Sequence, residues 1–383
     1  MTFLTRLETA PGSAAQLALS QRGRAALEGL GSLQRHAASV IRARARQDFE
    51  NLKVPSPPAG EADRQIWRAW LREARALAER SAAYRLERFH QRFVAEEIFN
   101  RAIPAVEDRR AYFEKFFELP DRPQLGSLEL DPALDLPRYY RHVEWHLEPG
   151  GWDGYDLYGA VLAFALGPHV FRHGGYAAVE VGDDILQQRE TALRQFRSPR
   201  LRRLYEPGCG GFSTMAAAHR LYPAAEKVAS DLSPLLLTVG HVMAERSGVP
   251  VQFKQRDARD TGEPDASFDG VIMYALMHEM TLPVAQASLQ EAFRILEPGG
   301  EIVISDPPPF RAVSAFQAVV LDWETRHRGE PFFSDACIAN WAKELQTAGF
   351  TEVEEYALGD QGYPYITRGR KPAAAATTGG VSR

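Results

Sequence analysis

A glycine-rich segment that contains one acidic residue carries the clearest chemical signal in the sequence. Residues 204–213 are LYEPGCGGFS, in which Glu206 precedes Gly208 and Gly210. Glycines allow sharp turns and the close approach of a ligand to the backbone, because they carry no Cβ atom. A carboxylate beside such a loop repels phosphate and attracts a cation, and Ser213 replaces the last glycine of the dinucleotide-binding spacing Gly-x-Gly-x-x-Gly. The segment therefore favours the sulfonium and ammonium groups of S-adenosyl-L-methionine over a dinucleotide, with a plain structural turn as the alternative.

Two further acidic residues follow candidate strands. Asp231 ends the second strand and precedes Leu232 and Ser233, and Asp257 and Ala258 follow the third. A carboxylate at the tip of the second strand can accept hydrogen bonds from both ribose hydroxyls. Asp257 can accept from an adenine amino group, while the small Ala258 leaves room for the ring. The alternatives are a helix cap at Asp231 or Ser233 and an ordinary loop aspartate at Asp257.

A histidine and a glutamate follow the fourth candidate strand. Residues 274–280 are YALMHEM, so Tyr274 ends the strand and His278 and Glu279 lie just beyond it. Because an imidazole titrates near neutral pH, His278 is a candidate catalytic base, and Glu279 is a residue that orients or replaces it. The alternative is that the pair only shapes the loop.

These residues need a scaffold that brings the ends of several strands together. From about residue 199, short apolar runs alternate with helical patterns, which predicts a parallel sheet with helices on both faces. Ligands bind such sheets at the carboxyl ends of the strands. The predicted strands are 203–206, 227–231, 251–255, 268–274, 301–306, 351–357 and 363–367, and the predicted helices between them are 213–221, 234–247 and 283–295.

The sequence before this region has a mainly helical pattern, interrupted by the proline-rich segment 53–60. We predict a helical N-terminal domain over residues 1–198, which caps the site and is a candidate dimer interface. An α/β domain follows over 199–370. The small and polar residues 371–383 are predicted to be a disordered tail.

Aromatic residues are frequent between residues 139 and 176 and after the fifth strand. Packing in the core explains most such residues. A helical cap of this composition can also close an apolar pocket over a cofactor and exclude water. Tyr155, Tyr158, His173 and Trp323 are therefore candidates for orienting a substrate.

Five segments resemble, in their order and approximate spacing, the class I S-adenosylmethionine-dependent methyltransferase family, in particular the small-molecule branch that includes ubiquinone and menaquinone methyltransferases. They are EPGCG at 206–210, SDLSP at 230–234, RDA at 256–258, FDGVI at 268–272 and LEPGGEIVISD at 296–306. The resemblance covers roughly 199–370. It implies a Rossmann-like α/β fold with a seven-stranded methyltransferase sheet whose last two strands form a hairpin. The family's third glycine falls at Phe212, where this sequence departs from the pattern.

The resemblance also implies a cofactor and its contacts. The cofactor is S-adenosyl-L-methionine, with Glu206, Gly208 and Gly210 at its methionine portion, Asp231 at the ribose, and Asp257 with Ala258 at the adenine. Leu232 and Tyr274 are two further candidate cofactor contacts. We therefore expect methyl transfer to an oxygen or carbon of a small, partly apolar or aromatic metabolite. Residues 306–310, DPPPF, are similar to a signature of amino-group methyltransferases, but they follow the fifth strand rather than the fourth, and we interpret them as a rigid loop.

Composition excludes several other classes of protein. The formal net charge of −5 gives no global footprint for nucleic acid or an anionic membrane, and two cysteines cannot build a disulfide framework or a cysteine-rich zinc site. No metal site is predicted, and we expect a cytoplasmic protein without a membrane span. Two alternatives stay open, namely an NAD-dependent oxidoreductase and a non-enzymatic interaction or scaffold protein with a methyltransferase-like fold.

Overall fold

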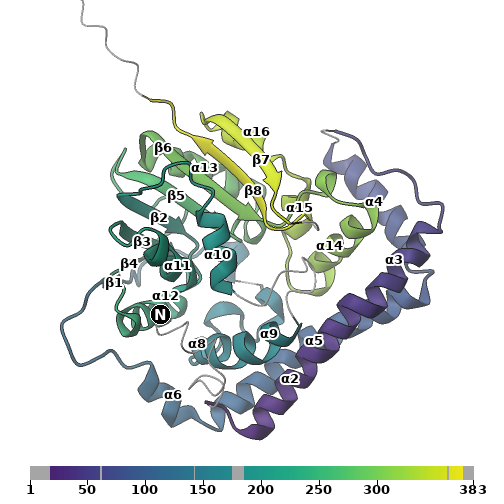
Figure 1. Cartoon of the computed structure of the whole chain (residues 1–383), viewed down its shortest axis with the longest axis horizontal. Coiled ribbons are helices and arrows are strands. Elements are labelled where there is room, and N and C mark those ends of the chain that lie inside the picture. Colours follow the sequence, from purple (N-terminus) through teal and green to yellow (C-terminus); the bar gives the residue numbers. More distant parts are fainter. Residues whose placement is uncertain (1–17, 61–62, 142, 175–184, 360–361, 374–383) are drawn as a thin grey trace, which may run out of the picture.

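The computed structural model describes residues 18–60, 63–141, 143–174, 185–359 and 362–373 of the chain. One sheet organises the described residues, with its strands in the order β1-β4-β3-β2-β5-β6-β8-β7 (Figure 1). Neighbouring strands are parallel from β1 to β6, and β8 runs antiparallel to both β6 and β7. The strands are β1 (Ser127–Glu129), β2 (Arg203–Pro207), β3 (Glu226–Asp231), β4 (Gln252–Gln255), β5 (Phe268–Tyr274), β6 (Leu296–Asp306), β7 (Thr351–Ala357) and β8 (Tyr365–Arg370).

Alternation of side chains along the strands divides the core into two layers. In β5, Ile272 packs in one buried cluster, whereas Val271 and Met273 pack in the cluster on the opposite face. The first face is covered by α10 (Ile185–Leu193), α11 (Ser213–Leu221) and α12 (Pro234–Ser247), and the second by α13 (Leu282–Ile295) and α16 (Trp341–Thr347). The predicted α/β class, with helices on both faces and a terminal hairpin, is confirmed.

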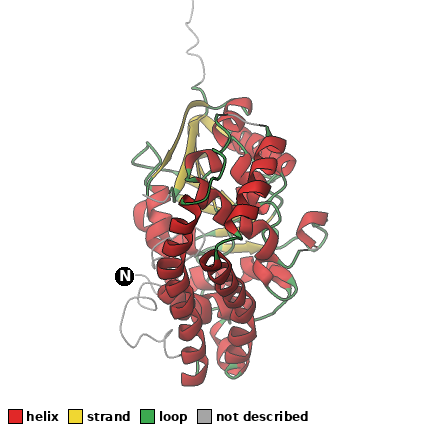
Figure 2. Cartoon of the chain, turned by 90° about the vertical axis from the view of Figure 1, so that its right-hand side faces the viewer, coloured by secondary structure: helices red, strands yellow, loops and turns green. Residues whose placement is uncertain are grey.

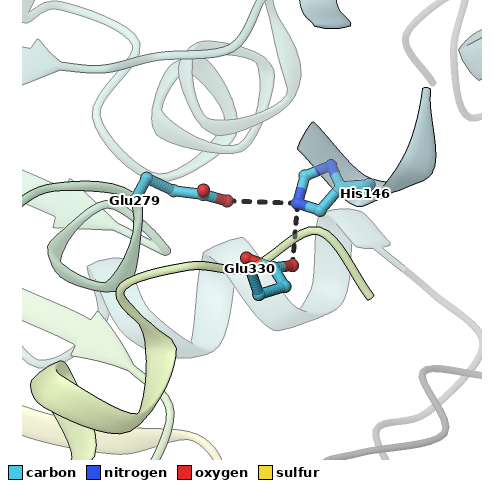
Figure 3. Close-up of side chains that lie close together, drawn as sticks. All are labelled: His146, Glu279 and Glu330. Atoms are coloured by element: carbon cyan, nitrogen blue, oxygen red, sulfur yellow. Dashed lines mark hydrogen bonds and ion pairs between the residues drawn. The ribbon is translucent and has the colours of Figure 1, made fainter. Parts of the chain in front are cut away.

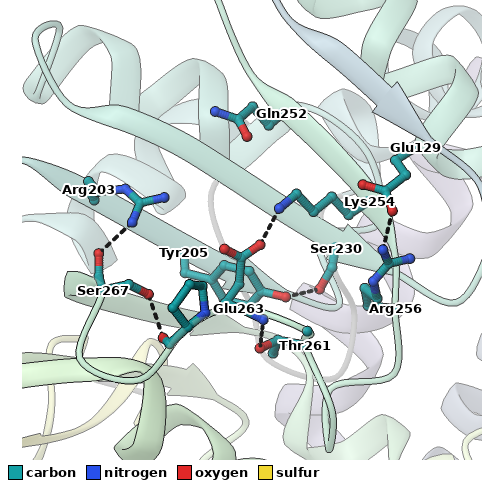
Figure 4. Close-up of polar contacts among 12 residues, drawn as sticks. Glu129, Arg203, Tyr205, Ser230, Gln252, Lys254, Arg256, Thr261, Glu263 and Ser267 are labelled. Atoms are coloured by element: carbon teal, nitrogen blue, oxygen red, sulfur yellow. Dashed lines mark hydrogen bonds and ion pairs between the residues drawn. The ribbon is translucent and has the colours of Figure 1, made fainter.

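The sheet has one strand more than the seven we expected. β1 lies in a segment that the prolines mark as loop, and it extends the sheet by pairing in parallel with β4. The backbone just before β1 lies so close to that of Val251 that only glycine fits at position 126. A Cβ atom there would lie 2.1 Å from the backbone oxygen of Val251. Arg256, just after β4, contacts Glu129 of β1 (Figure 4). A strand of only three residues has too little periodicity to be predicted from sequence.

The N-terminal region is helical, as expected. Its larger helices are α2 (Gln21–His36), α3 (Arg42–Glu50), α4 (Arg64–Ala78), the 26-residue α5 (Ala82–Glu107) and α6 (Arg110–Phe116), joined to a π-helical segment η1 (Ala37–Ile41). Shorter elements follow, namely α7 (Arg138–Arg141), η2 (Trp145–Leu147), η3 (Gly151–Asp153), α8 (Tyr158–Ala160), the π-helical η4 (Val161–Phe171) and α9 (Arg172–Gly174). In Figure 2 the long helices face the viewer and most strands lie behind them.

This region contacts the α/β domain at two places. One buried cluster joins α2, α5 and η4 to Leu236 of α12. Another joins α3 and α4 to α14 (Ala315–His327) and α15 (Phe333–Ile338), which follow the short helix η6 (Phe310–Ala312). Arg42 and Glu87 form a buried ion pair of 2.8 Å between α3 and α5. The division at residue 198 stays a prediction, and both β1 and α10, which precede it, pack on the sheet.

Among the described residues, no helix combines the length and the apolar character needed to cross a membrane. The predicted tail falls almost wholly on residues 374–383, which lie outside the described part of the chain.

Candidate active site

A cavity of about 410 Å³ opens where β2, β3 and β5 end. It receives nine of the residues that we predicted for the site, which are Gly208, Gly210, Asp231, Leu232, Ala258, Tyr274, His278, Glu279 and Tyr158. Within the described part of the chain, five other predicted residues are not among those that line it, namely Glu206, Asp257, Tyr155, His173 and Trp323. The N-terminal region and the α14–α15 segment supply further walls, including Tyr140, His146, Glu148, Trp152, Glu324, Arg328 and Glu330.

The glycine loop and Asp231 form one hydrogen-bonded unit at the edge of the cavity. Gly208 and Gly210 have φ angles of 63° and 55°, which favour glycine. The Gly210 N–H donates to one carboxylate oxygen of Asp231 at 2.8 Å, and the Ser233 N–H donates to the other at 2.9 Å. Burial raises the pKa of Asp231. The α12 cap is Ser233, whose hydroxyl accepts from Leu236, so Asp231 instead ties the glycine loop to the end of β3.

Glu206 is the second-last residue of β2, two residues before Gly208, and is 1% exposed. Its Oε2 atom has no hydrogen-bond partner among the described residues. Burial raises its pKa to about 8, although a hydrogen bond with Thr214 and the charge of Arg189 oppose the shift. A buried carboxyl with an unpartnered oxygen, next to a loop that lacks basic residues, suits a ligand that brings a positive charge. The site therefore fits the ammonium and sulfonium of S-adenosylmethionine better than a diphosphate.

Asp257 is bound to its own loop. Its carboxylate accepts hydrogen bonds from the backbone and guanidinium of Arg259, at 2.9 and 2.7 Å. Ala258 lines the cavity beside it. The contact of Asp257 with adenine stays a prediction. It would require the Asp257 carboxylate to accept a hydrogen bond from adenine in addition to those from Arg259.

His278 lies in the short helix η5 (Met277–Glu279) and is held by a carboxylate. Its Nδ1 atom is 2.6 Å from Oδ1 of Asp306, whose other oxygen accepts from the Met277 N–H at 2.7 Å. Burial alone would lower the pKa of His278, but the charges of Asp306 and Glu279 outweigh it and hold the pKa well above its ordinary value. We predicted that residues 306–310 form a rigid loop. Sequence reasoning missed that Asp306, at the end of β6, orients the histidine.

A second histidine, His146, faces two carboxylates across the cavity (Figure 3). Its Nε2 atom is 3.1 Å from Oε1 of Glu279 and 2.9 Å from Oε1 of Glu330. Its Nδ1 atom is 3.3 Å from Oε1 of Glu148, to which the Tyr158 hydroxyl also donates. No pattern in the sequence marks His146, Glu148 or Glu330, because they come from loops far from the recognisable motifs.

The backbone at His146 and Leu147 is strained. His146 and the following Leu147 both have positive φ angles, 53° and 64°, which side chains with a Cβ rarely adopt. The segment is held by the loop before α15, where the His146 N–H donates to the oxygen of Gly329 at 3.3 Å. A Cβ atom on Gly329 would lie 2.5 Å from the oxygen of Glu144. Such strain persists where the surrounding structure over-determines it, typically at functional sites.

Of the four candidate substrate residues, only Tyr158 reaches the cavity within the described chain. The Tyr155 hydroxyl donates to Glu107 at 2.6 Å. His173 packs against the backbone of Gly31 in α2. The guanidinium of Arg88 stacks on the Trp323 ring, with its Cζ atom 4.8 Å from the ring centroid. The roles of Tyr155, His173 and Trp323 stay predictions, and these contacts place them in packing rather than on the cavity wall.

Known proteins are similar to the part of the chain that contains the glycine loop, Asp231 and His278. A family model described as a methyltransferase domain matches residues 205–300. The chain is 34% identical over 88 residues to demethylmenaquinone methyltransferase of Thermus thermophilus, which covers 23% of this chain and 39% of the relative. It is 28% identical over 154 residues to ubiquinone biosynthesis O-methyltransferase of Xanthomonas axonopodis pv. citri, which covers 38% of this chain and 62% of the relative.

Among solved structures, phosphoethanolamine N-methyltransferase 2 of Haemonchus contortus in complex with S-adenosyl-L-methionine has a TM-score of 0.39 and 14% identity, over 49% of this chain and 52% of that chain.

The chain therefore contains a methyltransferase domain over residues 205–300, which agrees with the class I S-adenosylmethionine-dependent methyltransferase resemblance of the sequence. The class of cofactor, S-adenosyl-L-methionine, follows with it. The chain spans only 39% and 62% of the lengths of the two curated relatives. The family match begins at residue 205, so it includes none of the N-terminal helices that wall the cavity.

Proposed function

We propose that the protein transfers the methyl group of S-adenosyl-L-methionine to an oxygen or carbon of a small, partly apolar or aromatic metabolite. One observation carries the proposal. A single cavity joins the glycine loop and Asp231 to His278 and to the aromatic wall of the N-terminal region. Its volume of about 410 Å³ lies in the range of small-molecule sites. In-line transfer requires donor and acceptor side by side, and this cavity borders the residues proposed for both.

On the donor side, the chain's own residues would bind and orient the cofactor. Asp231 would accept hydrogen bonds from the ribose hydroxyls, and Ala258 would leave room for the adenine. Glu206, Gly208 and Gly210 would surround the methionine portion, with Leu232 and Tyr274 completing the wall. The cofactor supplies an activated methyl group on a sulfonium, so the protein mainly has to position the two reactants.

On the acceptor side, the wall offers both apolar surface and polar groups. Apolar side chains from α5 and η4 line it, among them Ile98, Phe99, Leu162, Leu166 and Phe171. Trp152 packs flat on Trp145 with ring centroids 4.9 Å apart. Together they would exclude water and bind an apolar or aromatic acceptor.

His278 would contact the acceptor beside the donor, held in orientation by Asp306. Two roles are open to His278. As a base it would take a proton from the acceptor, and as a hydrogen-bond donor it would only orient the acceptor. His278→Ala is expected to preserve cofactor binding and to lower turnover. His278→Gln separates the roles, since glutamine donates a hydrogen bond but cannot take up a proton. Activity in the Gln variant well above the Ala variant supports a donor, and equal loss in both supports a base. Unchanged turnover in both would remove His278 from the mechanism.

Isothermal titration with S-adenosylhomocysteine tests the cofactor site. Binding is expected for the folded chain, and Asp231→Ala is expected to weaken it more than tenfold, given about 1.5–3 kcal/mol for hydrogen bonds to a charged group. Failure of a demonstrably folded chain to bind would refute the proposal. Incubation of metabolite extracts with methyl-labelled donor would then identify the acceptor.

Two rivals make different predictions in these assays. A non-enzymatic scaffold would label no acceptor, and cofactor that co-purifies with the chain in a mass spectrum of the denatured protein would argue against it. An NAD-dependent oxidoreductase would bind NADH in a fluorescence titration, which the family match and the carboxylates at the loop disfavour.

We also propose a homodimer formed through α5, a cytoplasmic location and the absence of a nucleic-acid partner. Leu86, Phe89 and Phe93 lie on one face of α5, and Phe89 is 63% exposed. Isolated apolar residues are normal on surfaces, but a stripe at helical spacing suits a partner helix. The two thiols, Cys209 and Cys337, are both free, which fits a reducing compartment.

A further inference from the structure

We infer that His146, Glu279 and Glu330 form a site for one divalent transition-metal ion inside the cavity. The site needs only these residues, whereas its role toward an acceptor rests on the methyl transfer proposed above. The three come from separate parts of the chain, namely η2, η5 and the loop before α15 (Figure 3).

The spacing of the ligand atoms fits a metal ion. Metal–ligand bonds of about 2.1 Å place neighbouring ligands of an octahedral ion about 3.0 Å apart. Nε2 of His146 lies 2.9 Å from Glu330 and 3.1 Å from Glu279. All of the candidate ligand atoms lie within 4.8 Å of one another. An ion can therefore be placed between them with small movements of the side chains.

Glu148 orients the histidine for this role. It lies at Nδ1 of His146, on the side of the ring away from the two other carboxylates. A metal-binding histidine commonly donates its second N–H to a carboxylate, which fixes the tautomer and leaves the other nitrogen free to bind metal.

Burial and charge point to a cation in the same place. Glu279 and Glu330 are 9% and 8% exposed, and both line the cavity. The Oε2 atom of each is buried without a hydrogen-bond partner among the described residues. These orphaned oxygens are a second observation, independent of the spacing. Buried carboxylates are costly unless they are paired or bind a metal.

The nearby basic groups meet this need only in part. His278 supplies one positive charge beside Glu279, since its Nε2 atom lies 3.4 Å from Oε1 of that carboxylate and its pKa is raised. Arg328 also lines the cavity, but its guanidinium is 3.6 Å from Glu324. Arg88 is bonded to Glu87. An imidazolium at His146 would compensate one negative charge of the three carboxylates around it, and a divalent ion would compensate two. The remaining rival is that the imidazolium groups of His146 and His278 alone balance these carboxylates.

The donor set indicates the kind of metal. One imidazole with two carboxylates suits Mn²⁺, Fe²⁺ or Zn²⁺, whereas Ca²⁺ and Mg²⁺ prefer sites made only of oxygen. Three protein ligands leave coordination positions open toward the cavity. A hydroxyl or phenol of an acceptor could bind there, and its oxygen would lose its proton more easily next to the ion. The site thus favours oxygen over carbon as the atom that is methylated.

The site is tested by titrating the metal-stripped full chain with Mn²⁺ alone. Electron paramagnetic resonance measures the free Mn²⁺ that remains, and calorimetry measures the binding. One ion per chain is expected. Glu330→Gln and His146→Ala are each expected to weaken binding by at least about thirtyfold, and Glu148→Gln by about tenfold. Glu291→Gln is the matched control, because it neutralises a buried carboxyl that is not among the described residues lining the cavity, and it is expected to change the affinity less than about threefold.

Two results would overturn the assignment. One is the absence of Mn²⁺ binding up to about 1 mM in a folded chain. The other is binding that Glu330→Gln leaves unchanged, which would locate the ion elsewhere. If His146→Ala does not fold, Glu330→Gln and Glu148→Gln decide the question. Titration of the same samples with S-adenosylhomocysteine reports separately on the cofactor site, so failure of the metal site is distinguished from failure of the proposed function.

Discussion

Glu206 makes cofactor binding depend on pH in a direction that can be worked out in advance. Without ligand, its carboxyl is buried, one oxygen is unpartnered, and its pKa is raised to about 8. The ligand-free protein at neutral pH therefore holds a proton on Glu206. If the ammonium of S-adenosylhomocysteine binds beside this group, the ionised form is favoured and the proton is released.

The magnitude follows from the pKa of about 8. At pH 7 a group with this pKa is about nine-tenths protonated, so binding is expected to release about 0.9 proton per ligand. Affinity then rises nearly tenfold for each pH unit below the pKa and levels off above it. Between pH 6 and pH 8 the expected gain in affinity is about fiftyfold.

The stability of the ligand-free protein changes in the opposite direction. The pKa of Glu206 is raised in the folded state from an ordinary value of 4.5. Between about pH 4.5 and pH 8 the folded state binds a proton that the unfolded state has lost. Its contribution to stability therefore falls as pH rises, by about 1.4 kcal/mol per pH unit. A bound ligand would offset this loss.

Calorimetry in two buffers with different ionisation enthalpies measures both the affinity and the released protons. Glu206→Gln keeps the shape of the side chain and removes its titration. This variant is expected to bind more weakly, to release no proton through this group, and to show a flat profile from pH 6 to pH 8. A wild-type profile as flat as that of the variant would refute the pairing of Glu206 with the ligand's positive charge.

Three other changes test the loop, the helical region and the dimer. Gly208→Ala forces an alanine to a φ of 63° with its Cβ 2.3 Å from Leu276, so we expect a loss of about 1–2 kcal/mol of stability by denaturant unfolding and weaker binding of S-adenosylhomocysteine. Glu87→Gln leaves the buried Arg42 with a neutral partner, and we expect a loss of several kcal/mol in the same measurement, with no loss contradicting a structural role for the pair. Phe89→Asp is expected to convert a dimer into a monomer by light scattering, and a wild-type chain that is already monomeric would remove the proposed interface.

The α/β domain could be predicted because its signals are local. β5 was predicted over the same residues that the structure shows, since a buried parallel strand is a continuous apolar run between polar segments. Gly208, Gly210 and Asp231 were placed by motifs within a few residues of strand ends. The fold then brings those ends together without further information.

The acceptor side could not be predicted, because its residues meet only through tertiary packing. His146 and Glu330 lie 133 and 51 residues from Glu279 along the chain, and no local pattern distinguishes them from surface residues. Aromatic content pointed to the right region but not to the right residues. Tyr158 reaches the cavity, whereas Tyr155, three positions earlier, faces Glu107 instead. That difference depends on the path of the loop between η3 and α8, which composition does not determine.

This division between the two halves of the cavity has a consequence for specificity. The family match spans residues 205–300, which contain the glycine loop, Asp231 and His278 but neither His146 nor Glu330. The donor half can therefore be shared with relatives that methylate different compounds. The proposed acceptor half is assembled by η2, η3, η4 and the loop before α15, which hold Glu148, Trp152 and Glu330 against the shared part. If the acceptor is chosen there, changes at Glu330 should alter which extract component is labelled and leave S-adenosylhomocysteine affinity unchanged, whereas changes at Asp231 should do the reverse.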